Sequence, residues 1–478
     1  MQVKKIVSLC AIACAAMSGQ ANAAMTAAEQ AIVNDAVANG RVIFISGASA
    51  TQKGFTGIIS AMFTGTPIRF AETTASSKDF EAVAGKLATA AGSWAANSNV
   101  IIIDRVKGGS VFGVDPVARA TAIESLKVTS ATCGSAGAGT AASPYVCSKT
   151  AVADYMVPDA GVSDVAPALF QSPYNTEGET AAPALDAAEL ADLTATPIYG
   201  LAFGVPLTKN LPLFNLNKAA VSAIMTGNVG TWDQVDASLP ADDIVVCRRV
   251  PGSGTQAVDN LYFGNYPCSN DVNYPADRDA SSAWDPVARK FTVTGGTGGL
   301  VVVENSTSGD VRKCLDQAVT GGTFAGKDRD GNAVTVDFGA GGHKAIGVLS
   351  MDSLKDSKTT GNWQFRSLDG AGTITWDNTA NPVATSGTGK FPTLASYMDG
   401  TWDLQGWISF NVPSRTTGDK KAVLDQFLLK AQDPAILASI TDLKNVAAAI
   451  PGGAYSGAQV LRAQYLGNNQ CAPLNRNF

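Results

Sequence analysis

The segment Cys-Arg-Arg-Val-Pro-Gly-Ser-Gly-Thr, residues 247–255, lies between an apolar run at 244–246 and a predicted helix at 256–263. Its glycines allow the backbone to approach a ligand closely. The free N–H groups at the start of the helix carry partial positive charge toward that ligand. The segment therefore predicts a turn, between a buried strand and a helix, that binds an anion.

The side chains of this turn supply the donors that a tetrahedral oxyanion needs. The Arg249 guanidinium can donate a bidentate fork to two ligand oxygens. Hydroxyl and amide donors follow at three consecutive residues: Ser253, Gly254 and Thr255. The same residues also fit an ordinary helix start capped by a hydroxyl side chain, and the sequence leaves both interpretations open.

A second turn of this kind, Gly-Ala-Ser-Ala-Thr at residues 47–51, follows a predicted strand at 41–45 and precedes a predicted helix at 52–63. Its candidate anion donors are Ser49, Ala50 and Thr51. The turn resembles the nucleophile elbow of hydrolases, but the final glycine is missing. A serine hydrolase also needs a base, and His343 is the sole histidine of the chain. An anion-binding turn fits better, and a plain helix cap remains the alternative.

Two polar residues stand at other predicted strand ends. Ser110 closes the turn Lys-Gly-Gly-Ser at 107–110, after a predicted strand at 99–103. Asp164 lies in Val-Ser-Asp-Val-Ala-Pro at 162–167, where it supplies one carboxylate after a short loop. An aspartate in this position is also typical of a turn or a helix cap, so its role stays open.

Strands and helices alternate along the chain. A predicted amphipathic helix at 26–39 precedes the strand at 41–45, and the helix at 52–63 precedes the strand at 99–103. This order predicts an α/β fold with a largely parallel sheet. Because ligands of such sheets bind at the carboxyl ends of the strands, the turns described above are expected to lie on the ligand-binding side.

The N-terminus has the features of an export signal. Lys4 and Lys5 precede an apolar run at 6–17, and Ala-Asn-Ala at 21–23 is a small-x-small cleavage site. We predict a signal peptide at 1–23 and a mature chain that starts at Ala24, in the periplasm or secreted. No later segment approaches the roughly 20 apolar residues of a membrane span.

Six cysteines remain in the predicted mature chain, and an even number in an exported protein favours disulfides. The short loops predict Cys133–Cys147 and Cys247–Cys268, which leaves Cys314–Cys471 as the third pair. No Cys-x-x-Cys motif is present, and a single histidine excludes multi-histidine metal sites. We therefore expect no metal and no cofactor.

The charge of the chain is acidic. The formal net charge of −6 becomes −8 once Lys4 and Lys5 leave with the signal. An acidic protein without a basic stripe is not expected to bind nucleic acid. It can still bind an anion, because net charge is screened beyond about 8 Å at physiological salt and the pocket acts at shorter range.

Three stretches are predicted to be loops. Residues 130–143 are rich in Gly, Ala, Ser and Thr, and residues 368–389 are rich in Gly, Thr and Asn. Both are interpreted as insertions. Asp-Arg-Asp-Gly-Asn at 328–332 resembles part of a calcium loop but lacks the remaining acidic ligands, so a hairpin turn is the better prediction.

Taken in order, these segments resemble the periplasmic phosphate-binding proteins of bacterial ABC phosphate uptake, a branch of the type 2 periplasmic binding proteins. The segments that carry the resemblance are residues 47–51, 107–110, 162–167, 223–232 (Ala-Ile-Met-Thr-Gly-Asn-Val-Gly-Thr-Trp), 248–255 and 345–348. They span most of the predicted mature chain, and 248–255 is the best match. One departure is Pro251, which stands where many members carry an aspartate that pairs with the arginine.

The resemblance implies two α/β lobes joined by two hinge crossings, near 204–206 and 407–410. Lobe one would comprise 24–205 with 405–478, and lobe two would comprise 206–404. The ligand would lie in the cleft between the lobes and close it.

The resemblance also implies a function, which is the capture of inorganic phosphate or a related oxyanion by a non-enzymatic monomer that serves an ABC permease in the inner membrane. The implied ligand-binding residues are Ser49, Ala50, Thr51, Ser110, Asp164, Arg249, Ser253, Gly254 and Thr255. Asp164 would accept the proton of the phosphate. Two alternatives stay open: a secreted phosphatase on the same scaffold, and a surface protein that has lost ligand binding.

Overall fold

The computed structural model describes residues 25–74, 78–134, 136–176, 184–213, 215–269, 271–277, 284–295, 299–329, 331–353, 361–369, 374–376, 382–384, 393–451 and 459–476. The predicted signal peptide therefore lies outside the described residues. So does most of the predicted insertion at 368–389, of which Leu368 and Asp369 and two short strands are described. No helix among the described residues is both long and apolar enough to cross a membrane.

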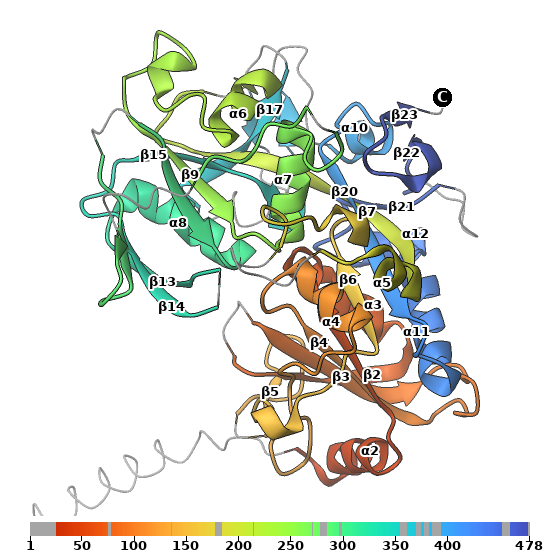
Figure 1. The fold of residues 1–478 in the computed structure, drawn as a ribbon. Coiled ribbons are helices and arrows are strands. Elements are labelled where there is room, and N and C mark those ends of the chain that lie inside the picture. Colours follow the sequence, from red (N-terminus) through yellow and green to blue (C-terminus); the bar gives the residue numbers. More distant parts are fainter. Residues whose placement is uncertain are drawn as a thin grey trace, which may run out of the picture.

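Figure 1 shows two groups of elements, which we call the first lobe and the second lobe, on either side of two long strands. These strands are β7 (Leu193–Thr208) and β20 (Gln405–Pro413), and they pair antiparallel with each other. The main sheet runs through both lobes in the order β12-β9-β15-β7-β20-β6-β1-β4-β3-β2-β5. The fold is therefore mixed α/β, with β7 and β20 as the connection between the two groups.

The first lobe is built from the N-terminal part of the chain and one later helix. Its strands are β1 (Val42–Gly47), β2 (Phe63–Ala71), β3 (Phe80–Leu87), β4 (Asn99–Arg105), β5 (Tyr145–Val146) and β6 (Ala160–Ser163). Its helices are α2 (Ala27–Ala38), α3 (Gln52–Ser60), α4 (Asp115–Ala118), α5 (Ala187–Asp192) and α11 (Gly418–Ala431). Strand β1 pairs parallel with β4 and β6, while β3 pairs antiparallel with β2 and β4. The largely parallel sheet predicted from the sequence is wrong, because the described sheet is mixed.

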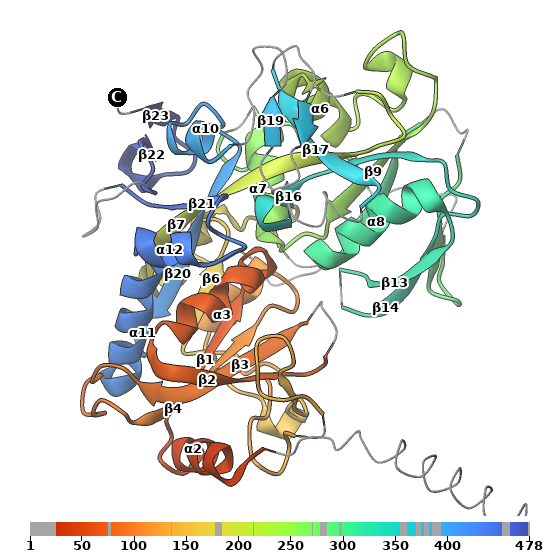
Figure 2. The ribbon, with the colours of Figure 1, turned by 180° about the vertical axis from the view of Figure 1, so that it is seen from behind.

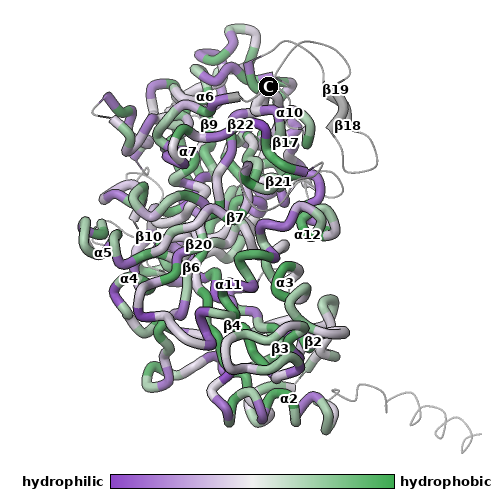
Figure 3. The backbone as a smooth tube through the Cα atoms, turned by 90° about the vertical axis from the view of Figure 1, so that its right-hand side faces the viewer, coloured by the Kyte–Doolittle hydropathy of each residue, from purple (hydrophilic) through white to green (hydrophobic). Residues whose placement is uncertain are grey.

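The side chains of β1 show why both faces of this sheet are covered. Ile43 and Ile45 belong to the large core beneath α3 and α11, and Phe44 belongs to a second core beneath α2. Successive side chains of a strand point to opposite faces, so the all-apolar run buries both of them. Figure 2 shows α3 and α2 against different parts of the sheet, and Figure 3 shows hydrophobic residues along α3, α11 and the strands that they cover.

The ends of the predicted helices need small corrections. Thr26 is the N-cap of α2, and Glu29 completes its capping box, so the helix itself begins at Ala27. Helix α3 ends at Ser60, because Phe63 already belongs to β2. The helix predicted at 256–263 begins two residues earlier, at Gly254, and includes Gly264.

The second lobe contains the strands β8 (Asn215–Leu216), β9 (Ile244–Arg249), β10 (Trp284–Asp285), β11 (Lys290–Thr292), β12 (Val301–Asn305), β13 (Thr323–Lys327), β14 (Ala333–Asp337), β15 (Lys344–Gly347), β16 (Leu349–Ser350), β17 (Trp363–Leu368), β18 (Ile374–Trp376) and β19 (Pro382–Ala384). Its helices are α6 (Lys218–Met225), α7 (Gly254–Gly264) and α8 (Ser308–Thr320). Strands β12, β9 and β15 are parallel neighbours. Strands β13 and β14 form the hairpin that the turn at 328–332 predicts.

The rest of the C-terminal part packs beside β7, with α12 next to α11 of the first lobe (Figure 1). Its elements are α10 (Leu394–Met398), α12 (Pro434–Ser439), β21 (Ala447–Ala449), β22 (Ala463–Tyr465) and β23 (Leu474–Arg476). The two predicted hinge crossings lie on β7 and β20. The exact lobe boundaries, 24–205 with 405–478 and 206–404, stay predictions.

All six cysteines of the predicted mature chain are paired, and two of the three predicted pairs are wrong. Cys133–Cys147 is present, whereas the other pairs are Cys247–Cys314 and Cys268–Cys471. Helix α8 packs across β9, which brings Cys314 to a Cα–Cα distance of 5.9 Å from Cys247. Cys268 instead follows α7 and bonds to the C-terminal segment.

Peptide mapping of the exported protein checks this pairing. We expect proteolysis without reductant to release the cross-linked peptides Cys247–Cys314 and Cys268–Cys471, because both pairs bring distant segments within bonding geometry. A Cys247–Cys268 peptide as the main product would contradict the structure, and free thiols at these sites would contradict export to an oxidising compartment.

Candidate functional site

The predicted site residues come from turns at the carboxyl ends of strands in both lobes. In the first lobe, residues 49–51 follow β1, Ser110 follows β4 and Asp164 follows β6. In the second lobe, residues 253–255 follow β9. The backbone N–H of Val111 donates to the carbonyl of Gly252 at 2.9 Å, so these turns meet across the two lobes.

Asp164 lies at the centre of this meeting point. Its side chain is buried, and its Oδ2 accepts a hydrogen bond of 3.3 Å from Thr255 Oγ1 of the opposite lobe. Its backbone N–H donates to Ser110 Oγ, also at 3.3 Å. Its other carboxylate oxygen, Oδ1, is buried and has no hydrogen-bond partner within the protein. A buried acceptor without a donor is costly, so this oxygen is suited to accept a proton from a bound ligand.

The surroundings of Asp164 shift its acidity. Burial raises the pKa of Asp164 from its ordinary value of 3.8 to about 7, although Arg249 and the hydrogen bond from Thr255 act in the opposite direction. The carboxylate of Asp352 adds to the increase. The group is therefore held close to the pH at which it gains or loses its proton.

Arg249 crosses from β9 toward the first lobe. Its Nη1 donates to Ser49 Oγ and to Ser308 Oγ, each at 3.1 Å, and its Nη2 donates to the carbonyl of Ser306 at 2.6 Å. Its Nε donates to the carbonyl of Asn305 at 3.2 Å. The guanidinium is buried, and it is held by the end of β12, by the residues that follow β12 and by Ser49 of the first lobe, so its position is fixed by the protein itself.

The start of α7 packs directly on this site. A Cβ on Gly254 would lie 2.4 Å from Ser110 Oγ and 2.5 Å from Asp164 Cβ, so only glycine fits there. Gly252 adopts a positive φ of 87°, which glycine tolerates without strain. The close approach leaves the first N–H groups of α7 beside the buried carboxylate.

Two predicted ligand hydroxyls make structural hydrogen bonds. Ser253 is the N-cap of α7, and its Oγ accepts from the N–H of Gln256 at 3.4 Å. Thr51 Oγ1 donates to the carbonyl of Ala48 at 2.9 Å within its own turn. Ser253 and Thr51 therefore play the capping and turn roles that the sequence left open. Their ligand contacts, like those of Ala50, stay predictions.

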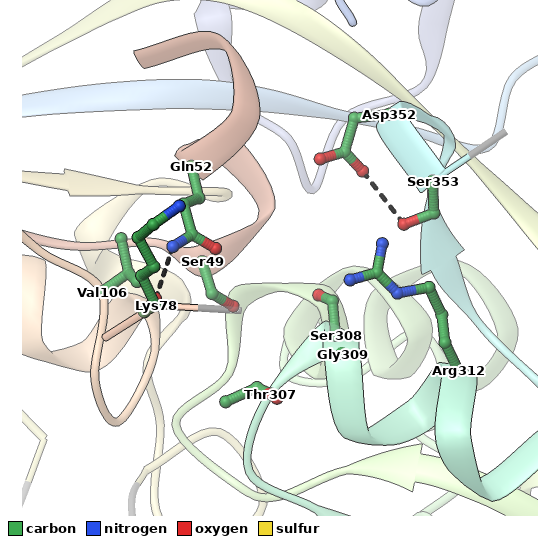
Figure 4. A pocket seen from close by; sticks show the side chains of 10 residues that line it. All are labelled: Ser49, Gln52, Lys78, Val106, Thr307, Ser308, Gly309, Arg312, Asp352 and Ser353. Carbon is green, nitrogen blue, oxygen red and sulfur yellow. Dashed lines mark hydrogen bonds between the residues drawn. The ribbon is translucent and has the colours of Figure 1, made fainter. Parts of the chain in front are cut away.

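Figure 4 shows a pocket between the lobes that the sequence analysis did not find. The first lobe lines it with Ser49, Gln52, Lys78 and Val106. The second lobe lines it with Thr307, Ser308, Gly309, Arg312, Asp352 and Ser353. Of the predicted site residues, only Ser49 lines this pocket. Residues 301–309, an apolar strand followed by Asn-Ser-Thr-Ser-Gly and a helix, repeat the pattern of residues 244–255 and carried the signal that could have found it.

The serine-hydrolase interpretation gains no support from this geometry. Ser49 Oγ accepts from Arg249, which does not act as a base. His343 lies directly before β15, where its Nε2 is 3.3 Å from the carbonyl of Phe338. Within the part of the chain that the structure describes, no three His, Cys, Asp or Glu residues are grouped to hold a metal ion.

No family model and no curated protein sequence matches the chain. Among solved structures, the chain is similar to a candidate phosphate ABC transporter substrate-binding protein from Clostridium perfringens, solved with bound phosphate, at 13% identity and a TM-score of 0.41, over 85% of this chain and 98% of that one.

Two further likenesses are to proteins of the same description. A phosphate-binding protein from Stenotrophomonas maltophilia is 13% identical, with a TM-score of 0.37 and coverage of 83% of each chain. An ABC-type phosphate transport receptor from Vibrio cholerae is 14% identical, with a TM-score of 0.30, over 57% of this chain and 74% of that one. By their descriptions, all three neighbours are phosphate-binding or phosphate-transport proteins.

Proposed function

We propose that this chain is an exported oxyanion-binding protein that captures inorganic phosphate between its two lobes. The observation that carries the proposal is the buried Asp164 carboxylate, which has one unpartnered oxygen and lies beside Arg249, Thr255 and the start of α7. A site made of donors plus a single acceptor matches phosphate, which at neutral pH has both unprotonated oxygens and at least one O–H group.

The same arrangement supports selectivity. Sulfate has no proton at neutral pH, so above pH 7, where Asp164 is ionised, its oxygens would face the carboxylate without a hydrogen bond between them. Leaving a buried acceptor unpaired costs about 1–3 kcal/mol, and more for a charged group. The proposed site therefore prefers phosphate through a penalty against sulfate as well as through its own donors.

The contacts across the lobes support a ligand-linked closure. Ser49, Ser110 and Asp164 of the first lobe meet Arg249, Gly254 and Thr255 of the second, and Lys327 of β13 forms an ion pair with Asp79 of the first lobe. A ligand held by both groups would stabilise this arrangement. We extend the proposal to a periplasmic or secreted monomer that delivers phosphate to an ABC permease.

Calorimetry on the exported protein tests this function. We expect saturable binding of phosphate and at least 100-fold weaker binding of sulfate at the same salt and at a pH well above 7, where Asp164 is ionised, with molybdate and a phosphonate as further oxyanions. Equal affinities for phosphate and sulfate, or no binding of any oxyanion, would overturn the proposal. A p-nitrophenyl phosphate assay on the same sample tests the phosphatase alternative.

A further inference from the structure

We propose that Asn260 of α7 and Asn175 of the first lobe are positioning residues that hold the two lobes together around the bound ligand and so set its release rate. Together with Gln256 they form what we call the amide network. The proposal rests on the proposed function, since the ligand is the oxyanion placed at Asp164 and Arg249. None of the three amides is among the predicted ligand-binding residues.

The amide network begins at the oxyanion site. Gln256 Oε1 accepts a hydrogen bond of 3.2 Å from the backbone N–H of Arg249. Its Nε2 donates to Asp259 Oδ2 and to Asn260 Oδ1, each at 2.9 Å. An amide nitrogen has two protons, and both are used here, so these neighbours fix the orientation of the Gln256 side chain.

The network continues from α7 into the first lobe. Because Asn260 Oδ1 accepts from Gln256, the Asn260 amide directs its two protons toward the opposite lobe. Its Nδ2 donates to Asn175 Oδ1 at 2.8 Å and to the carbonyl of Tyr174 at 3.3 Å. One side chain of α7 therefore makes two hydrogen bonds across the lobes.

Asn175 belongs to the loop that follows Asp164. Its Nδ2 donates to the carbonyl of Leu169 at 2.8 Å, which anchors the side chain within the first lobe. The network thus joins the end of β9, which carries Arg249, to the loop after Asp164. The two halves of the proposed site are connected by a path that does not pass through the ligand.

Burial makes this contact depend on closure. Gln256, Asn260 and Asn175 are 4%, 5% and 0% exposed. Separation of the lobes would break both hydrogen bonds that Asn260 donates and would bring the amides into water. Tyr266, just after α7, adds a bond to the same loop, since its hydroxyl donates to the carbonyl of Ser172 at 3.0 Å.

The ligand and the amide network stabilise the same closed arrangement. Without ligand, closure leaves Asp164 Oδ1 buried and without a hydrogen-bond partner, which opposes the closed state. The proton of a bound phosphate supplies that partner, so the amide contact forms together with the complex. A contact made in the bound, closed state and absent from the open one slows release and leaves the encounter with the open lobes unchanged.

The test is a double-mutant cycle with Asn260→Ala, Asn175→Ala and the double variant. Calorimetry gives the phosphate affinity, and displacement of radiolabelled phosphate by excess unlabelled phosphate gives the release rate. Each single variant is expected to raise the release rate about tenfold and to change the association rate less than about threefold. The double variant is expected to exceed either single variant by less than about threefold, because both substitutions remove the same contact.

Asn210→Ala is the matched control. The Asn210 amide also donates to two groups, the carbonyls of Gly342 and His343, but both belong to the second lobe. This substitution is expected to change the release rate less than about twofold, because it breaks no contact between the lobes.

Asn260→Asp repeats the test without a cavity. It keeps the size of the side chain but offers at most one proton, so it cannot donate to both Asn175 and Tyr174, and it is expected to speed release in the same direction. Urea unfolding without phosphate adds a readout for a merely structural role. That role would lower the stability of the ligand-free variants and leave the release rate unchanged.

The outcomes separate the network from the proposed function. An unchanged release rate in the single variants, or single effects that multiply to about 100-fold in the double variant, would overturn the network while phosphate binding by the wild type keeps the function in place. Slower association with unchanged release would also overturn it, because the amides would then shape the open site. A wild type that binds no phosphate would overturn both.

Discussion

Replacing Arg249 with lysine is expected to weaken phosphate binding at least 100-fold, which corresponds to about 2.7 kcal/mol. Lysine keeps the charge but offers no planar fork, and it cannot reach Ser49, Ser308 and the two backbone carbonyls at once. Lysine is preferable to alanine because Arg249 is buried, and alanine would leave those carbonyls without a donor. Calorimetry with phosphate gives the readout.

Arg248→Lys is the matched control for this variant. Arg248 is the neighbouring residue of β9, points to the other face of the strand and pairs with Glu304 at 2.9 Å. The same substitution there is expected to change phosphate affinity less than threefold. If Arg249→Lys binds phosphate with wild-type affinity, Arg249 holds the lobes together without contacting the ligand, and the proposed site is wrong.

Asp164→Asn is expected to lower the phosphate-to-sulfate affinity ratio by about 100-fold. The amide oxygen can still accept the proton of phosphate, so phosphate binding weakens moderately. Sulfate binding strengthens, because the amide N–H₂ group can donate to an oxygen that the carboxylate repelled. The measurement is competition calorimetry at fixed salt and at one pH above 7, where Asp164 of the wild type is ionised. A constant ratio would make Asp164 a turn residue without a role in ligand choice.

The same variant has a second expected result in the absence of ligand. Since burial raises the pKa of Asp164 to about 7, the folded protein binds this proton more tightly than the unfolded chain does. The buried carboxylate therefore lowers the free energy of unfolding as pH rises from about 4 to 7. Asp164→Asn removes this cost and is expected to stabilise the ligand-free protein above pH 7 by roughly 4 kcal/mol.

Urea unfolding in phosphate-free buffer at several pH values measures this difference. The gain is expected to vanish near pH 4, where the carboxyl group is protonated in both states. Burial also raises the pKa of Asp259 to about 7, so the wild type keeps some pH dependence from that group. The difference between the variant and the wild type isolates Asp164, and a variant less stable at pH 8 would contradict the expectation.

Local sequence patterns predicted the strand, turn and helix segments that carry the candidate site residues. The apolar run before residue 247 and the glycines after it specify a strand, a tight turn and a helix, because these features depend on neighbours a few residues apart. The same reasoning holds for residues 41–60. It also holds for the Cys133–Cys147 pair, whose partners are 14 residues apart.

The order of the strands in the sheet determines which of these strand–turn–helix units lie next to one another. Cys247 bonds to Cys314 because α8 packs across β9, and no rule of spacing along 67 residues specifies that packing. The antiparallel pairing of β7 and β20 likewise determines which turns face one another between the lobes.

The sequence by itself determined the strand–turn–helix units, the acidic and cysteine-paired character of the chain, and the candidate residues Asp164 and Arg249. Only the tertiary structure decided that Asp164 keeps one oxygen unpartnered, that Arg249 is held by Ser308, and that Lys78 and Arg312 enter one pocket. The physical reason is distance along the chain. Propensity and capping act over a few residues, whereas burial and electrostatics depend on elements brought together by packing.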